Sequence, residues 1–174
     1  MKNEKFKKFV KEYLPYILII VAVLLIKRFV ISPVNVVGDS MYPTLHDGYV
    51  MLLDEIYYKF DKLDRFDIVV IKYKDSSGKS ELIIKRVIGL PGDTVSYDKG
   101  KLYINGKYIK EKFSHAETID FGPVTLDDDE YFVMGDNRTV SLDSRYIGPI
   151  KIKDIRGRTI ISIYPFNKFG KSDY

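Results

Sequence analysis

Two residues have the types and surroundings needed for nucleophilic chemistry: a serine in a turn and a lysine in an apolar strand. Ser40 lies in GDSMYPTL, residues 38–45, and its Gly-Asp-Ser sequence predicts a turn. Lys85 lies in LIIKRVIGL, residues 82–90, where strand alternation places apolar neighbours on its side. Apolar surroundings disfavour the charged amine, so Lys85 could accept a proton from a serine hydroxyl. Composition alone also fits a charged residue that protects an edge strand.

Other catalytic side chains are scarce. The chain has no cysteine, which excludes a thiolate nucleophile and a disulfide framework. It has two histidines, His46 and His115, and an imidazole metal site would use both and still need carboxylates. We therefore expect no metal and no cofactor, and we interpret both histidines as surface polar residues. This leaves lysine as the natural base, in the Ser-Lys variant of the catalytic triad.

The body that must position these residues is predicted to be mainly β. Six segments are rich in valine, isoleucine, tyrosine and phenylalanine: residues 66–74, 81–90, 94–98, 101–109, 130–135 and 156–166. Within one of them, Asn105-Gly106 predicts a tight hairpin, because both residues tolerate positive φ. Closely spaced strands of this kind favour a sheet assembly that closes or folds over itself.

The N-terminal part is predicted to be a membrane anchor. Residues 13–26 are uncharged, and a helix over residues 13–31 would be about 28 Å long, close to the hydrocarbon thickness of about 30 Å. Lys27 and Arg28 would then extend toward the far interface. The uncharged run also fits the core of a cleavable signal peptide or a buried helix. No small-x-small cleavage site follows it, which favours a retained anchor.

Charge is concentrated at the N-terminal end. The net charge is +4, and residues 1–12 carry five lysines against two glutamates. Residues 34–174 are nearly neutral, with 21 basic and 22 acidic side chains. This distribution argues against nucleic-acid binding, which needs a concentrated basic face. It predicts a cytoplasmic tail over residues 1–12, a transmembrane anchor over 13–31 and an extracytoplasmic catalytic domain over 32–174.

Four sequence boxes occur in a familiar order. GDSMYPTL, FDIVV (66–70), KRVIGLPGD (85–93) and GDNRTVSLDSR (135–145) resemble the boxes of the bacterial type I signal peptidases, in their short, Gram-positive-like form. These are membrane-anchored Ser-Lys endopeptidases of bacterial secretion, and the resemblance covers nearly all of the chain. It implies a mainly β, signal-peptidase/LexA-like antiparallel β-sheet assembly with one N-terminal transmembrane helix. It also implies a single-pass protein of the cell membrane that contacts lipid, and we expect a monomer.

The resemblance assigns roles residue by residue. Ser40 matches the nucleophile and Lys85 the general base. Ser141 matches the serine whose hydroxyl orients the lysine amine, and Asp143 and Arg145 match a supporting ion pair. The backbone N–H of Ser40 is the expected first donor to the oxyanion.

This chain also departs from the family pattern. Gly38 stands where Gram-negative members place a second serine, so the second oxyanion donor stays open. Phe66 replaces a usual glycine and Val140 a usual asparagine, which puts local packing in doubt more than activity.

The implied substrates are preproteins whose signal peptides end in small-x-small, typically Ala-x-Ala. The pockets for such residues must be shallow and apolar, and the resemblance suggests these wall residues: Val34, Val36, Met41, Leu45, Ile83 and Ile84. An extended substrate could add as a strand between residues 33–37 and 81–85, with backbone hydrogen bonds that do not depend on its sequence.

Two other classes of function stay open. A soluble LexA-like Ser-Lys autoprotease would share the catalytic pair, but it would carry a DNA-binding helix-turn-helix in place of the anchor. A non-enzymatic, membrane-anchored β domain for interactions would explain the anchor and the sheet and leave the boxes unexplained.

Overall fold

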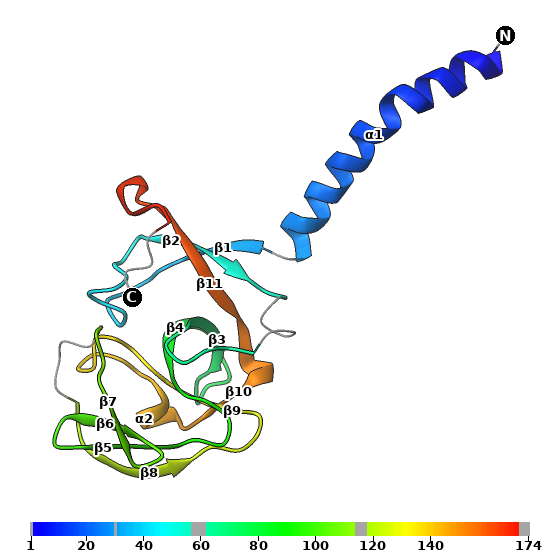
Figure 1. Ribbon diagram of the computed structural model, residues 1–174. Coiled ribbons are helices and arrows are strands. Elements are labelled where there is room, and N and C mark those ends of the chain that lie inside the picture. The colour runs from blue at the N-terminus through cyan, green and yellow to red at the C-terminus, as the bar shows by residue number, and fades with distance from the viewer. Residues whose placement is uncertain (1, 30, 57–61, 114–117, 171–174) are drawn as a thin grey trace.

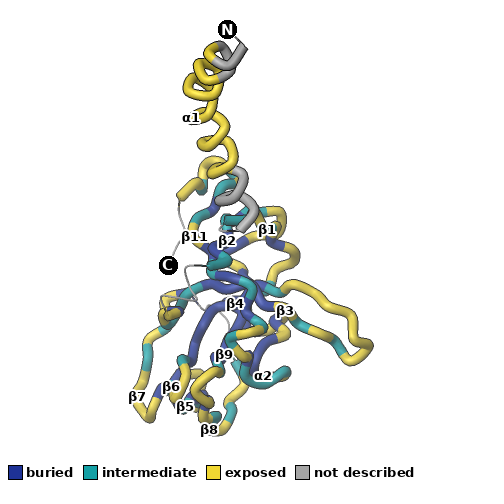
Figure 2. Tube along the Cα trace, turned by 90° about the vertical axis from the view of Figure 1, so that its right-hand side faces the viewer, coloured by how far each residue is buried: buried dark blue, intermediate teal, exposed yellow. Residues whose placement is uncertain are grey.

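The computed structural model describes residues 2–29, 31–56, 62–113 and 118–170. It begins with one long helix, α1 (Lys2–Phe29), which projects away from a β body (Figure 1). This helix covers the predicted tail and most of the predicted anchor, and strand β1 begins at Ile31, where the sequence predicts the last residue of the anchor. The surface of α1 is exposed along residues 7–23 (Figure 2). Across the described ranges, no helix combines the length and the apolar character that a membrane span requires.

The described part of the body contains eleven strands in two antiparallel sheets. The strands are β1 (Ile31–Asn35), β2 (Val50–Asp54), β3 (Ile68–Lys74), β4 (Ser80–Gly89), β5 (Thr94–Asp98), β6 (Lys101–Ile104), β7 (Lys107–Ile109), β8 (Phe121–Thr125), β9 (Glu130–Met134), β10 (Ile150–Lys151) and β11 (Ile155–Tyr164). The short helices are α2 (Ser144–Ile147), η2 (Ile152–Asp154) and η3 (Phe166–Lys168). The larger sheet has the order β1-β2-β11-β3-β4-β9-β10, and the smaller one has the order β7-β6-β5-β8. The smaller sheet lies at the end of the body away from α1 (Figure 1).

The prediction of a mainly β, antiparallel body is confirmed. Each of the six predicted segments contains a strand, and the hairpin at residues 101–109 turns at Asn105 (φ 53°) and Gly106 (φ 75°). Both residues therefore adopt the positive φ that a tight hairpin turn requires.

Three apolar clusters support the segments that carry the sequence boxes. The first packs the middle of β3 and β4 against β9 and β11. The second joins the two sheets, because it unites side chains of β5 and β6 with Phe132 and Met134 of β9. The third lies under the GDSMYPTL turn and contains Met41 and Leu45. Burial of this kind fixes the relative positions of segments that are far apart in the sequence.

Two of the unpaired strand edges among the described residues matter for the site. Strand β1 ends the larger sheet and pairs with β2 alone. Strand β4 pairs with β3 along residues 80–86, but its other edge meets β9 only from Arg86 onward. The edge of β4 that leads up to Lys85 is thus open, and this opening is where the chemistry-bearing residues meet.

Candidate active site

Ser40 is carried by a closed loop, residues 37–48, which we call the serine loop. Its neck is formed by Val36, whose N–H donates to the carbonyl of Tyr49 (2.8 Å) and whose carbonyl accepts from the N–H of Gly48 (3.0 Å). Inside the loop, the N–H of Gly38 donates to Oδ1 of Asp47 across 2.7 Å. Gly38 has φ +78°, a conformation that glycine adopts without steric cost. The Gly38 amide is therefore already engaged by a carboxylate.

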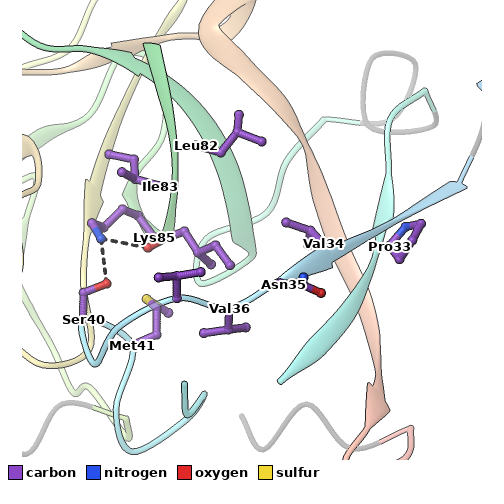
Figure 3. A pocket seen from close by; sticks show the side chains of 11 residues that line it. Pro33, Val34, Asn35, Val36, Ser40, Met41, Leu82, Ile83 and Lys85 are labelled. Atoms are coloured by element: carbon purple, nitrogen blue, oxygen red, sulfur yellow. Dashed lines mark hydrogen bonds between the residues drawn. The ribbon is translucent and has the colours of Figure 1, made fainter. Parts of the chain in front are cut away.

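Lys85 approaches the serine loop from β4. Its side chain is 3% exposed, and its Nζ donates to Oγ of Ser40 and to the carbonyl of Ile84, both across 2.9 Å (Figure 3). Burial lowers the pKa of the Lys85 amine from 10.5 to about 8, against the opposing effect of the Asp143 and Asp136 carboxylates. A large fraction of the amine is thus neutral at mildly alkaline pH, as a general base must be.

Residues 135–145 form the third side of the site and contact the backbone of Ser40. The N–H of Asn137 donates to the carbonyl of Ser40 across 3.1 Å. Gly135 lies so close that a Cβ there would stand 2.5 Å from the Ser40 carbonyl oxygen and 2.3 Å from Oγ of Ser141. Only glycine fits this approach without displacing its neighbours.

The predicted ion pair between Asp143 and Arg145 is present and buried. Arg145 donates through Nε to Oδ1 and through Nη2 to Oδ2 of Asp143, each across 2.8 Å. The same carboxylate accepts from the N–H of Gly135 (2.9 Å). Two parallel N–H···O bonds fix both planar groups. Asp143 and Arg145 therefore hold the turn that brings residues 135–141 against Ser40.

Ser141 lies in the same turn with 4% exposure. Its Oγ makes no hydrogen bond to any described residue, so the expected bond to the Lys85 amine stays a prediction. A buried hydroxyl without a partner is uncommon and costs free energy. Such a group is consistent with a role in which its partner is engaged only during the reaction.

Arg138 was not singled out by the sequence and is buried in this segment. Its Nε donates to the carbonyl of Gly135 across 3.0 Å, and its guanidinium also bonds to Glu111 and to the hydroxyl of Tyr97. Tyr97 belongs to the smaller sheet, so Arg138 ties that sheet to the site. Its partners Glu111 and Tyr97 lie 27 and 41 residues away along the sequence, and a single sequence does not reveal such contacts.

A groove of about 370 Å³ leads from Ser40 and Lys85 between β1 and β4 (Figure 3). Its other lining residues are Pro33, Val34, Asn35, Val36, Val37, Met41, Leu82, Ile83 and Ile84. Five of the predicted wall residues thus line it. The prediction that Leu45 is a wall residue is wrong. Leu45 is 1% exposed, packs with Met51 and Leu53 in the core, and does not line the groove. Apolar type alone does not separate a pocket wall from the core beneath it.

The remaining candidates for chemistry are metal-binding clusters and the two histidines. Among the described residues, no three side chains of the types that bind metals come together. His46 is exposed and contacts the rings of Tyr42 and Tyr49 at 5.0 and 5.2 Å. His115 lies outside the described residues.

The comparisons with known proteins agree with the boxes. A sequence profile of the family described as "Signal peptidase, peptidase S26" matches residues 8–164. The chain belongs to this family. The chain is 41% identical to signal peptidase I S of Bacillus subtilis strain 168, over 99% of this chain and all of that protein. It is 34% identical to signal peptidase I of Streptococcus pneumoniae TIGR4, over 95% and 98% of the two chains.

A solved structure was also found. It is a signal peptidase I from Enterococcus faecalis V583, with 35% identity and a TM-score of 0.49, covering 56% of this chain and 97% of the other. Membership of the signal peptidase family decides among the three functions that the sequence left open. It favours an endopeptidase over a repressor-type autoprotease and over a non-enzymatic domain.

Proposed function

We propose that the protein is a membrane-anchored serine endopeptidase that removes N-terminal signal peptides from preproteins by a Ser40–Lys85 dyad. One observation carries this proposal: the buried Nζ of Lys85 lies 2.9 Å from Oγ of Ser40, at the end of an apolar groove. Signal-peptide removal is the activity named by the family to which the chain belongs.

The proposed reaction uses Lys85 as base and then as acid. The neutral Lys85 amine takes the Ser40 proton while Oγ attacks the scissile carbonyl carbon, and the proton then passes to the leaving amine. The acyl-enzyme is then hydrolysed by a water that gives its proton to Lys85 while its oxygen adds to the acyl carbon. The bond between the acyl carbon and Oγ breaks, and Lys85 returns the proton to Ser40. One N–H of Nζ donates to the Ile84 carbonyl, and in the proposed reaction the lone pair of the neutral amine points toward Oγ of Ser40. The backbone N–H of Ser40 is the proposed first donor to the oxyanion.

The substrate is proposed to bind as an extended strand in the groove between β1 and β4. The unpaired edges of both strands would supply backbone hydrogen bonds, and alternate substrate side chains would enter the groove. Met41 and Ile84 are buried apolar side chains that line the groove together with Ser40, so the wall near the nucleophile would suit small apolar substrate side chains. This supports cleavage after small-x-small sequences such as Ala-x-Ala.

We further propose that the helical part of the predicted anchor, residues 13–29, holds the protein in the cell membrane as a single pass, because Ile31 already belongs to β1. The body would then be extracytoplasmic and residues 1–12 cytoplasmic. The support is the uncharged run of residues 13–26 inside the continuous helix α1, together with the lysines of residues 1–12. Large apolar side chains such as Ile17, Ile19 and Ile20 are more than half exposed on α1, and lipid would cover them. Alkaline carbonate extraction of membranes tests this, because an anchored protein stays in the pellet.

The function is tested with the full chain purified in detergent. A labelled preprotein with an Ala-x-Ala site should be cut once, and sequencing of the product should give the residue after that site as the new N-terminus. A matched preprotein with phenylalanine in place of the last alanine should stay intact. Both preproteins should stay intact when they are incubated with the Ser40→Ala variant of the enzyme. Cleavage by Ser40→Ala, or cleavage at another kind of site, would contradict the proposal.

A further inference from the structure

The serine loop has a second attachment to β4, through Thr44. The Oγ1 of Thr44 donates to Oδ2 of Asp136 across 2.5 Å and accepts from Nη2 of Arg86 across 3.3 Å. Arg86 follows Lys85 in β4, so two successive strand residues hold the same loop at two points. Lys85 contacts Ser40, and Arg86 contacts Thr44.

Arg86 and Asp136 form a rigid support for this attachment. Their side chains have no solvent exposure, and Arg86 donates through Nε to Oδ1 (2.8 Å) and through Nη2 to Oδ2 (2.6 Å) of Asp136. The Nη1 of Arg86 donates to the carbonyl of Phe66 across 2.9 Å, and its guanidinium carbon lies 4.1 Å from the ring centre of Phe113. A bidentate pair that is also held on its other side is restricted in its geometry.

The Phe66 contact also explains one departure from the family pattern. Phe66 has φ +79°, the conformation that favours glycine, and it keeps that conformation while its ring packs edge-on against Phe113 at 5.0 Å. The carbonyl that Arg86 uses is thus presented by a backbone that the aromatic pair holds in place.

Thr44 is joined to Ser40 by a single turn. The N–H of Leu45 donates to the carbonyl of Met41 across 2.9 Å, and the Met41 and Leu45 side chains are both buried. A shift of Thr44 therefore moves the residues that follow Ser40 directly. We propose that Thr44 is a positioning residue, which fixes Oγ of Ser40 against Nζ of Lys85 by binding the buried Arg86–Asp136 pair. This inference rests on the proposed function and deepens it.

The hydroxyl of Thr44 is the part that matters, because it donates to the carboxylate and accepts from the guanidinium at once. Thr44→Val keeps the shape and removes both bonds, while Thr44→Ser keeps both bonds and removes a methyl group. Small displacements of reacting groups cost about 100-fold in rate. Because positioning acts in the transition state, we expect Thr44→Val to lower kcat about 10- to 100-fold with KM within about twofold of wild type. Thr44→Ser should keep at least about half of the wild-type kcat.

Thr159 provides a matched control. It is 4% exposed and its Oγ1 donates to the carbonyl of Ile68 across 3.2 Å, but it lies in β11 and outside the serine loop. Thr159→Val should lower thermal stability and leave kcat unchanged. If Thr44→Val does not fold, Thr44→Ala removes the same hydroxyl without adding a methyl group and is compared with Thr44→Ser in the same way.

The experiment measures kcat, KM and the thermal midpoint of each full-length variant on one Ala-x-Ala preprotein. A wild-type kcat in Thr44→Val or Thr44→Ala, a Thr44→Ser variant as slow as these, or an equal loss in Thr159→Val would each overturn the inference. A wild-type protein that does not cut the preprotein at all would instead contradict the proposed function.

Discussion

The Nζ of Lys85 and the Oγ of Ser40 lie 2.9 Å apart, although 45 residues separate them in the chain. At this distance a hydrogen bond can run in either direction, and the direction depends on the protonation of the amine. The ammonium form donates to the hydroxyl, whereas the neutral amine accepts from it. Catalysis by this pair therefore requires the neutral form.

The pH dependence of cleavage should report the Lys85 amine. Burial lowers its pKa to about 8, so the fraction of neutral amine, and with it kcat/KM, should rise as pH rises through about 8. Below that pH the rate should fall about tenfold per pH unit, because one proton blocks the base. The measurement is kcat/KM on a peptide without titratable groups, from pH 6 to 10. A rate that does not change over this range would contradict a lysine base.

The same burial should make Lys85 costly for stability. Its pKa is about 8 in the folded protein and 10.5 when free, so the folded state binds fewer protons between these values. The burial of Lys85 therefore costs little stability above pH 10.5, and this cost grows as pH falls from 10.5 to about 8. Lys85→Met removes the amine and keeps an unbranched chain, so we expect it to raise the free energy of unfolding by about 1–3 kcal/mol at pH 7. Activity should disappear.

Denaturant unfolding of wild type and Lys85→Met at pH 7 and at pH 10.5 measures this effect. The gain should shrink at the higher pH, where the wild-type amine is neutral in the folded state and about half neutral in the unfolded chain. A Lys85→Met variant that is less stable than wild type at pH 7 would show that the amine stabilises the fold, contrary to this expectation.

Ser141 offers a test in which stability and activity should separate. Its hydroxyl is buried without a partner among the described residues, so Ser141→Ala should leave the thermal midpoint unchanged or raise it slightly. If the hydroxyl orients the Lys85 amine in the transition state, kcat should fall by about 10- to 1000-fold with little change in KM.

Ser162→Ala is the matched control for Ser141→Ala. Ser162 is 1% exposed, but its Oγ donates to the carbonyl of Tyr164 across 3.2 Å, and both residues belong to β11 and not to the serine loop. We expect this variant to lose stability and keep its activity. Full activity of Ser141→Ala would reduce the proposed catalytic unit to Ser40 and Lys85.

The sequence predicted the elements whose signals are local. Strands such as β5 and the hairpin at Asn105-Gly106 follow from residue type and from the φ values that those residues tolerate. Strand β8 was not predicted, because its sequence FGPVT contains glycine and proline, which usually indicate turns. Strand β10 has two residues, too few to show any alternation.

Ser40 and Lys85 could be singled out because they stand in distinctive boxes, whereas the contacts that Thr44 makes could not be predicted. Thr44 and Asp136 are 92 residues apart, and nothing in either segment indicates that they meet. Leu45 was assigned to the groove because an apolar residue near a nucleophile fits a wall and a core equally well. The larger sheet decides between them, since it places Leu45 over Met51 and Leu53.

The last prediction concerns Gly135, where residues 135–145 pack against Ser40. A Cβ on this residue would stand 2.3 Å from Oγ of Ser141 and 2.5 Å from the carbonyl oxygen of Ser40. The serine side chain could rotate, but the Ser40 carbonyl belongs to the backbone and accepts from the N–H of Asn137. Gly135→Ala should therefore push the serine loop away from Lys85 and lower kcat at least about 100-fold.

The matched control for Gly135→Ala is Gly122→Ala. A Cβ on Gly122, in β8, meets no atom within 4 Å, and its φ lies outside the region that favours glycine. This variant should keep its activity and its thermal midpoint, or gain slightly in stability because alanine restricts the unfolded chain. Both variants are compared on the same preprotein, with thermal midpoints measured on the same preparations. Gly135→Ala with wild-type kcat would mean that the serine loop tolerates a shift of its backbone, and the close packing of Gly135 against Ser40 would then have no part in catalysis.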